Sequence, residues 1–220
     1  MTERIQKTLS FLTDYFEDGR WFKENPKDKV YRLDHSIRVA NICREIARKE
    51  GMDEEAAVIA GLLHDVAYGM DTPEGYLWKN HGRDGARIAR GFLKGLELDE
   101  QTLGDICYAI AIHVDDKADF EGRRTPFTET IGDADNIDRF DAWRIYESVR
   151  YQAKLEEKTL PEKLEWLIQR LDYLEKLSKI EFATPAATAM WQDKVEFQRQ
   201  YFSRLRAQME LSTLPKEDKR

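Results

Sequence analysis

Apolar residues return every three or four positions along most of the chain, and this period predicts helices throughout. The pattern covers about residues 2–16, 34–50 and 53–65, and it continues in helices that begin near residues 81 and 99. No segment alternates apolar and polar positions with a period of two, which is the pattern of a half-buried strand. The predicted fold class is therefore all-α, with the helices packed as a bundle.

Proline and glycine indicate where several of these helices begin or end. The segment around Pro26 is expected to follow the end of the first helix, and Gly51 is expected to end the second. Residues 69–79 contain two glycines and a proline and are predicted to form a loop. Because proline is well tolerated in a first turn, three later helices are expected to begin at such residues. They are Pro126, Pro161 and Pro185.

The leucines that follow Pro161 share one helical face and are expected to belong to the core. One compact domain spanning residues 1–220 is the favoured arrangement. In it the helices over about residues 160–212 pack on the rest of the chain. The alternative is that the last two helices form a separate satellite hairpin, and the sequence alone does not exclude it.

The chain has 220 residues and a formal net charge of −7. This acidic balance argues against broad binding to a nucleic-acid polymer, but it leaves room for a local basic pocket that holds a phosphate. The N-terminal residues lack the pattern of a signal peptide, and no apolar run approaches the length of a membrane span. Cys43 and Cys107 lie in apolar helical patterns, which is typical of reduced core cysteines. We therefore expect a cytoplasmic protein with no membrane partner.

All the histidines of the chain are expected at helix ends beside loops. They are His35, His64, His81 and His113. A helix bundle can bring such ends together at one mouth, and imidazole is a usual ligand of Zn, Fe, Mn, Co and Ni. A single histidine in a last turn would more simply be a cap that interacts with the helix dipole. The argument for a metal therefore depends on the histidines occurring together.

Carboxylates complete a candidate set of metal ligands. Asp65 follows His64 at the end of an alanine-rich apolar run, where two such groups are costly unless they are paired or bound to a metal. Asp135 and Asp138 stand three residues apart on a predicted helix and so share a face. Such a set suits two ions bridged by one carboxylate, which can hold a hydroxide and clamp the oxygens of a phosphoryl group.

The order and local sequence of these residues resemble those of the HD-domain metal-dependent phosphohydrolase superfamily. Residues 34–40, Asp-His-Ser-Ile-Arg-Val-Ala, resemble the first motif of the family, and residues 61–66, Gly-Leu-Leu-His-Asp-Val, resemble the second. Residues 112–113 and 133–138 resemble later motifs. The resemblance covers about residues 30–145, and it implies an HD-domain helical bundle with its metal-binding core there. More loosely, the C-terminal helices resemble those of small bacterial HD hydrolases.

The resemblance also implies roles for individual residues. The first metal site consists of His35, His64, Asp65 and Asp135, with Asp65 bridging. A second ion, in members that bind two, uses the positions of His81 and His113. Asp138 matches a further acidic position three residues beyond Asp135. Together with His64 and Asp65 it is expected to serve the chemistry, either directly or by supporting a metal ligand. The implied cofactor is one or two divalent ions of Mn, Fe, Ni, Co or Zn, with Mg also allowed.

Relatives commonly carry a lysine shortly after the His-Asp pair, and this chain departs from that pattern. Residues 66–70 contain no basic residue. Four basic residues are candidates for contacts with a substrate phosphate: Lys79, Arg83, Arg123 and Arg124. Arginine suits bidentate recognition of phosphate, although any one of these side chains could equally be an ordinary surface charge.

The function implied is hydrolysis of a phosphoester or phosphoanhydride bond in a nucleotide or other small phosphate compound, through a metal-bound hydroxide. Three alternatives stay open: a non-catalytic metal-binding regulatory protein, a purely structural metal site, and a di-iron oxidase on the same fold. An open coordination position beside a nucleotide-sized pocket would favour the hydrolase, whereas a closed shell would favour a structural metal. Oxygen consumption by redox-active iron would favour the oxidase. The implied partner is a small phosphorylated substrate rather than a nucleic-acid polymer, and the sequence does not decide whether the chain forms a homodimer.

Overall fold

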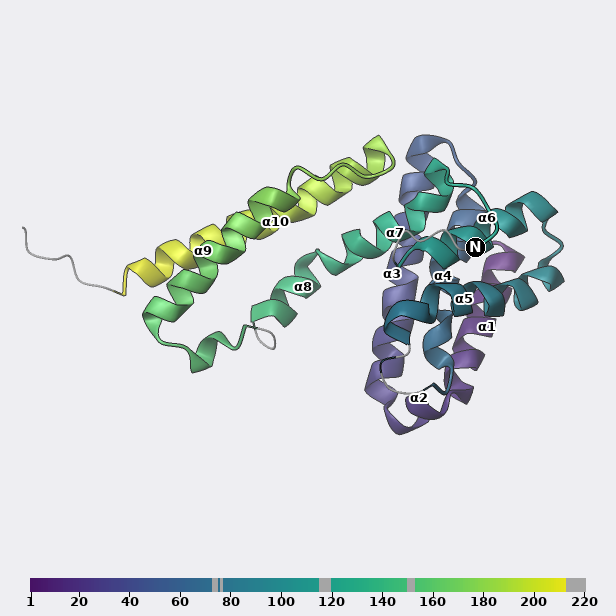
Figure 1. Cartoon of the computed structure of the whole chain (residues 1–220), viewed down its shortest axis with the longest axis horizontal. Coiled ribbons are helices and arrows are strands. Elements are labelled where there is room, and N and C mark those ends of the chain that lie inside the picture. The colour runs from purple at the N-terminus through teal and green to yellow at the C-terminus, as the bar shows by residue number, and fades with distance from the viewer. Residues whose placement is uncertain (73–74, 76, 115–119, 150–152, 213–220) are drawn as a thin grey trace, which may run out of the picture. The chain divides into compact units, whose positions relative to one another are not determined.

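The computed structural model describes residues 1–72, 75, 77–114, 120–149 and 153–212, apart from the side chains of residues 78, 79 and 147. Every regular element in these ranges is a helix, which confirms the all-α prediction (Figure 1). The α-helices are α1 (Glu3–Asp18), α2 (Arg20–Glu24), α3 (Pro26–Glu50), α4 (Glu54–Leu63), α5 (Leu77–Leu93), α6 (Glu100–Ile112), α7 (Pro126–Arg139), α8 (Ala142–Glu147), α9 (Leu160–Leu177) and α10 (Pro185–Glu210). The short 3₁₀ helices are η1 (Val66–Gly69), η2 (Lys94–Leu96) and η4 (Leu155–Glu157).

The chain divides into two compact units. The first comprises Met1–Asp138 together with Phe182–Ala187, and the second comprises Arg139–Glu181 together with Thr188–Arg220. The prediction that residues 1–220 form one domain, with the C-terminal helices packed on the rest, stays a prediction.

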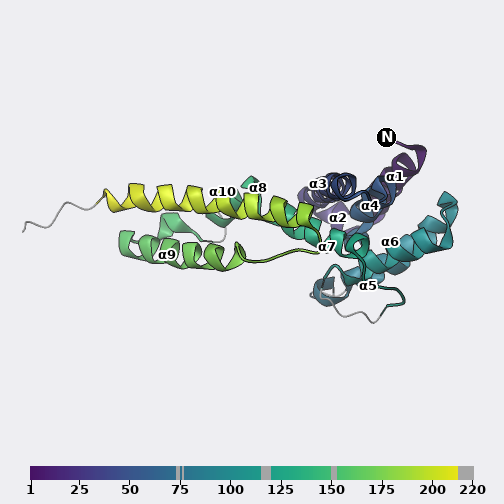
Figure 2. The same ribbon diagram turned by 90° about the horizontal axis from the view of Figure 1, so that it is seen from above.

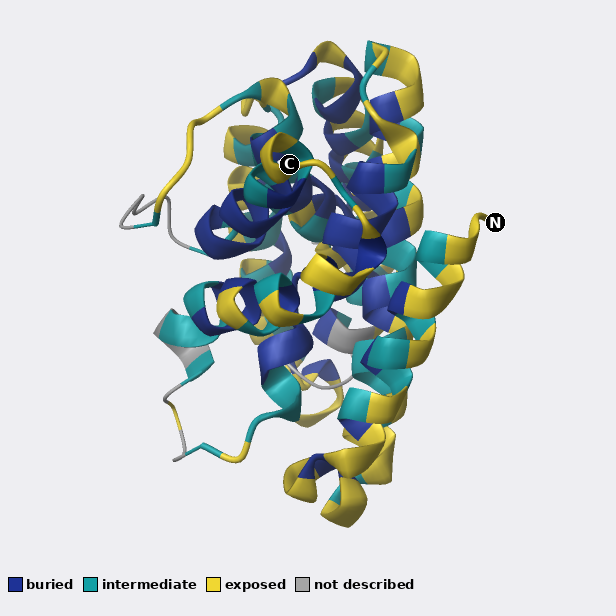
Figure 3. Cartoon of the chain, turned by 90° about the vertical axis from the view of Figure 1, so that its right-hand side faces the viewer, coloured by how far each residue is buried: buried dark blue, intermediate teal, exposed yellow. Residues whose placement is uncertain are grey.

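Helix α4 is the buried centre of the first unit. All its residues from Ala56 to Leu63 are buried, because apolar or small side chains follow one another on every face. Figure 3 shows buried positions mostly on the inner turns of the helices and exposed positions mostly on the outer turns. Asp53 caps the helix by accepting a hydrogen bond from the Ala56 N–H at 3.0 Å. Helix α3 approaches it closely, since a Cβ atom at Gly61 would lie 2.7 Å from the Cα of Ala40. Glycine at this position therefore allows the contact that brings the end of α4 beside α3.

Helix α3 begins at Pro26, well before the predicted start near residue 34. Proline fits the first turn because the N–H that it lacks would have no partner there. His35 consequently lies inside α3, so the prediction that it stands at a helix end is wrong. His64 and His113 do follow the last residues of α4 and α6, as predicted.

In the second unit, α9 and α10 lie side by side as an antiparallel pair (Figures 1 and 2). Leu174 of α9 is fully buried, which confirms that the leucine face belongs to a core. Trp166 packs edge-on against Phe202 of α10, with the ring centroids 5.6 Å apart. The indole N–H of Trp191 donates to the Leu177 carbonyl at 2.8 Å and so ties the start of α10 to the end of α9.

Cys43 and Cys107 are buried and free, as predicted. Within the residues that the structure describes, no helix combines the length and the apolar character needed to cross a membrane. The cytoplasmic location expected from the sequence stays a prediction.

Candidate metal centre

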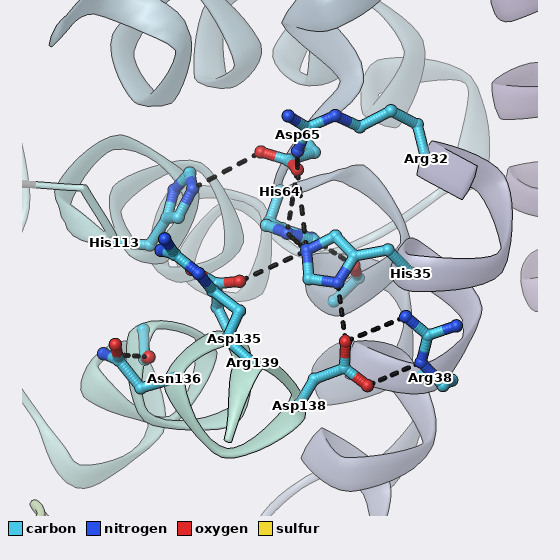
Figure 4. Close-up of polar contacts among 12 residues, drawn as sticks. Arg32, His35, Arg38, His64, Asp65, His113, Asp135, Asn136, Asp138 and Arg139 are labelled. Atoms are coloured by element: carbon cyan, nitrogen blue, oxygen red, sulfur yellow. Dashed lines mark hydrogen bonds and ion pairs between the residues drawn. The ribbon is translucent and has the colours of Figure 1, made fainter. Parts of the chain in front are cut away.

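Five helices of the first unit bring the predicted ligands to one place, which we call the His/Asp cluster (Figure 4). Its members are His35 of α3, His64 and Asp65 at the end of α4, His81 of α5, His113 at the end of α6, and Asp135 and Asp138 of α7. His64 and His113 occupy C-cap positions, so each follows a helix whose last turns are buried. Residues that are far apart in the sequence thus form one compact set of imidazoles and carboxylates.

Asp65 divides the four imidazoles into two pairs. Its Oδ2 lies 3.6 Å from Nε2 of His35 and 3.5 Å from Nε2 of His64. Its Oδ1 lies 3.5 Å from Nε2 of His81 and 3.8 Å from Nε2 of His113. One carboxylate therefore presents a separate oxygen to each pair, which is the geometry that a bridge between two ions requires.

Every imidazole is fixed by a hydrogen bond at Nδ1. In His64, His81 and His113, Nδ1–H donates to the backbone carbonyl three or four residues earlier, at distances of 2.6 to 2.8 Å. In His35 it donates to Oδ2 of Asp138 at 2.8 Å. All four Nε2 atoms are therefore directed at the cluster, and a partner at Nδ1 is the usual support of a histidine that binds metal through Nε2.

Two sets of ligand atoms are close enough to share an ion. One set comes from His35, His64 and Asp135 and the other from His64, Asp65 and His113, and the atoms of each set lie within 4.8 Å of one another. Nε2 of His35 lies 3.3 Å from Nε2 of His64 and 3.2 Å from Oδ1 of Asp135. Ligands placed tetrahedrally about 2.1 Å from one metal are separated by roughly 3.4 Å. The four residues predicted for the first ion thus lie together at suitable spacing.

Burial and hydrogen bonds within the cluster shift the pKa values of its histidines and aspartates. Burial lowers the pKa of His64 to about 4, so this imidazole is neutral at pH 7. Burial opposes a charge on His35 as well, but hydrogen bonds to Asp135 and Asp138 outweigh it and raise the pKa of His35 to about 9. The pKa of Asp135 falls to about 2 despite its burial, chiefly because His35 donates to it. Asp65 also keeps a pKa well below its usual range, since its interactions with the surrounding histidines and with Arg32 outweigh the effect of burial.

One buried nitrogen atom of the cluster lacks a hydrogen-bond partner among the described residues. This atom is Nε2 of His113. Its distance of 3.8 Å to Asp65 is too long for a hydrogen bond. Leaving such an atom unsatisfied costs about 1–3 kcal/mol. A metal ion between His113 and Asp65 would satisfy it, so the donor set fits the cofactor that the sequence predicts.

Asp138 lies on the outer side of His35. It accepts hydrogen bonds from Nδ1 of His35 and, at 2.7 and 3.1 Å, from the Nε and Nη2 of Arg38. This contact orients the imidazole and leaves its Nε2 for the cluster (Figure 4). The arrangement favours a positioning role for Asp138 over contact with an ion.

The structure does not test whether the four basic residues predicted to contact phosphate do so. The side chain of Lys79 lies outside the described residues, and Arg83 is half-buried on α5. Arg123 and Arg124 are exposed before α7, where Arg124 donates to Glu129 at 2.6 Å. Their predicted role therefore stays a prediction.

Sequence reasoning missed Arg32, which does reach the cluster. Its Nη1 donates to Oδ2 of Asp65 at 2.5 Å. Arg32 precedes His35 by one helical turn, and residues three apart share a face of a helix. The sequence analysis did not use this spacing between Arg32 and His35, because it placed the start of the helix near residue 34, after Arg32.

Comparison with known proteins identifies the architecture. The sequence profile of the HD domain matches residues 32–177. The crystal structure of a "predicted HD superfamily hydrolase" from an uncultured Thermotogales bacterium superposes with a TM-score of 0.62 at 23% identity, over 92% of this chain and 91% of that one. At this identity the likeness establishes the fold, and it confirms the predicted HD-type helical bundle.

Similar sequences occur within larger proteins. Ribonuclease Y of Oleidesulfovibrio alaskensis is 38% identical over 84 residues, which are 38% of this chain and 14% of that protein. Ribonuclease Y of Lactobacillus gasseri is 33% identical over 104 residues, which are 46% of this chain and 17% of that protein. The chain therefore matches less than a fifth of the length of these relatives.

Proposed function

The chain belongs to the HD-domain family, and from that premise we propose that it is a divalent-metal-dependent phosphohydrolase. It acts on a nucleotide or another small phosphate compound and breaks a phosphoester or phosphoanhydride bond. The ligands of the first ion are His35, His64, Asp65 and Asp135. A second ion is held by Asp65 with His81 and His113.

The division of the four imidazoles by Asp65 is the observation that carries this proposal. A structural ion needs one closed set of ligands. Here each oxygen of Asp65 faces its own pair of Nε2 atoms, at 3.5 to 3.8 Å. Two ions a few ångström apart are the arrangement used for in-line displacement at phosphorus.

Bound ions supply a water of lowered pKa and a clamp for the oxygens of the phosphoryl group. The chain's own residues prepare this position. Asp65 and Asp135 are ionised at neutral pH and attract the cations. Asp138, paired with Arg38, fixes the direction of His35. Complete burial of His64 keeps bulk water from that side of the cluster.

Metal analysis of the purified protein, followed by phosphate-release assays, tests the proposal. Chelator-treated protein is offered a panel of nucleotides and small phosphate esters, with Mn, Co, Ni or Mg added back one at a time. We expect bound divalent metal in the purified protein, and release of phosphate or pyrophosphate only after metal is restored. Metal binding without release from any compound would instead favour a regulatory protein, and oxygen consumption by an iron-loaded sample would favour an oxidase.

A second candidate function is cleavage of RNA, which the similarity to ribonuclease Y favours. The net charge of −7 argues against it, because binding to a polyanion depends on many basic contacts. Adding an RNA oligonucleotide to the same panel separates the two candidates. We expect faster hydrolysis of the small compounds, and preferential cutting of the oligonucleotide would reverse the assignment.

A further inference from the structure

The side chain of Arg32 lies at the oxygen of Asp65 that faces the first predicted ion. Its Nη1 donates to Oδ2 of Asp65 at 2.5 Å, and the same Oδ2 lies 3.6 Å from Nε2 of His35 and 3.5 Å from Nε2 of His64. Figure 4 shows Arg32 and His35 extending from the same helix toward the cluster. A guanidinium group is thus built into the edge of the candidate metal centre.

Tyr68 holds this guanidinium in place. The central carbon of the Arg32 guanidinium lies 3.6 Å from the centroid of the Tyr68 ring, within the range of a cation–π contact. Tyr68 belongs to η1, which directly follows Asp65, so the carboxylate and the aromatic ring are set by one short segment. The Arg32 side chain nevertheless keeps 25% of its surface exposed, so a ligand from solvent can reach it.

A simple ion pair does not account for this position once metal is bound. Asp65 would then share its negative charge with the ions, and Arg32 would lie beside cations with little left to balance its own charge. Among the described residues, Asp65 is the one carboxylate that Arg32 contacts. An incoming anion with several oxygens could bind the metals and the guanidinium together, and arginine presents a planar fork of donors that matches phosphate.

We infer that Arg32 binds the phosphoryl group of the substrate, moving its hydrogen bond from Asp65 to phosphate oxygens when the metal centre is loaded. This inference rests on the proposed function, because it requires metal at the cluster and a phosphorylated ligand. It assigns the phosphate contact to α3 rather than to the start of α5, which includes Lys79, or to the segment before α7, which includes Arg123 and Arg124.

Phosphate binding tests the inference without requiring turnover. Inorganic phosphate is titrated calorimetrically into Mn-loaded wild-type protein, Arg32→Ala and Arg32→Lys, with the metal content of each sample measured. The matched control is Arg48→Ala, which removes an exposed arginine of the same helix whose partner is Glu45 at 2.6 Å. Charge-assisted hydrogen bonds are worth about tenfold or more in binding, so we expect Arg32→Ala to weaken phosphate binding by at least about tenfold. Arg32→Lys should fall between it and the wild type, and Arg48→Ala should match the wild type.

The metal content shows whether Arg32 contacts phosphate or only holds Asp65 in position to bind metal. Unchanged metal content together with weaker phosphate binding supports the inference, and partial rescue of Arg32→Ala by millimolar guanidinium would support it further. Wild-type phosphate binding by Arg32→Ala, or loss of metal from that variant, would overturn it. If phosphate binding depends on Arg32 but no phosphate compound is hydrolysed, the proposed function fails, while the contact between Arg32 and a bound phosphate stands.

Discussion

Asp65 is the residue on which both halves of the cluster depend, because each of its oxygens faces a different pair of imidazoles. Asp65→Ala is therefore expected to reduce hydrolysis by orders of magnitude. The protein should remain folded, since its helices are held by apolar packing. Phosphate release shows the loss, and far-UV circular dichroism with a thermal melt serves as the folding control. Near-wild-type hydrolysis by chelator-treated and metal-replenished Asp65→Ala would show that the cluster does not carry the chemistry.

Substitution of His81 tests the second metal site separately from the first. Nε2 of His81 lies 3.5 Å from Oδ1 of Asp65, and His81 contributes to neither of the two closest ligand sets. His81→Ala should lower the metal content by up to one ion per chain while the first ion stays bound. Elemental analysis after dialysis measures the change. Unchanged stoichiometry and activity would remove His81 from the metal centre.

The charge on His35 predicts how metal binding depends on pH. Without metal the pKa of His35 is about 9, so at neutral pH a proton occupies the imidazole that the metal requires. Metal and proton compete, and the affinity for metal should rise by about tenfold for each pH unit from neutrality toward pH 9 if this proton alone is displaced. The neutral His64, with a pKa of about 4, adds no competition in that window.

Metal titrations of the chelator-treated protein between pH 6 and pH 9 measure this slope. Asp138→Asn provides the matched comparison, because losing a carboxylate partner should lower the pKa of His35 and flatten the dependence. An affinity that does not change with pH would show that His35 is not a ligand whose proton must leave.

The identity of the cluster residues could be predicted from the sequence, because the histidines and aspartates occur together in the order of the HD-family motifs. The resemblance to the HD family implied the same two pairs of imidazoles, with Asp65 bridging. Helical periodicity alone could not predict the pairing, because it depends on how the ends of α4 and α6 lie against α3 and α5. Arg32 was missed for a local reason, namely that Pro26 begins α3 and thereby adds two turns before His35.

At the scale of the elements, the contact between α3 and α4 sets the distance between His35 and His64. Gly61→Ala should destabilise the protein by about 1–3 kcal/mol, because the added carbon meets backbone rather than a movable side chain. The matched control is Gly104→Ala in α6, where nothing lies within 4 Å of an added Cβ. At that position the better helix propensity of alanine should stabilise the protein by about 0.5–1 kcal/mol.

Chemical denaturation of both variants measures these opposite changes in the free energy of unfolding. Equal stability of Gly61→Ala and the wild type would mean that α3 and α4 do not need the close approach. A metal affinity lowered in Gly61→Ala but kept in Gly104→Ala would tie this helix contact to the geometry of the His/Asp cluster.

For the whole molecule, helical periodicity was enough to predict an all-α fold, and the motif order was enough to predict the HD family. The periodicity shows which face of a helix is apolar but not which other helix covers it. For this reason the leucine face of α9 was correctly predicted as core, whereas the single-domain arrangement remains untested beside the two units that the structure contains.

The central claim is that the His/Asp cluster holds two ions bridged by Asp65. Anomalous diffraction from crystals of the full chain grown with Mn²⁺ tests it most directly. Two anomalous peaks are predicted, one at Oδ2 of Asp65 beside His35 and His64, and the other at Oδ1 beside His81 and His113. A map with no peak at the cluster, or with peaks only at surface carboxylates, would contradict the account.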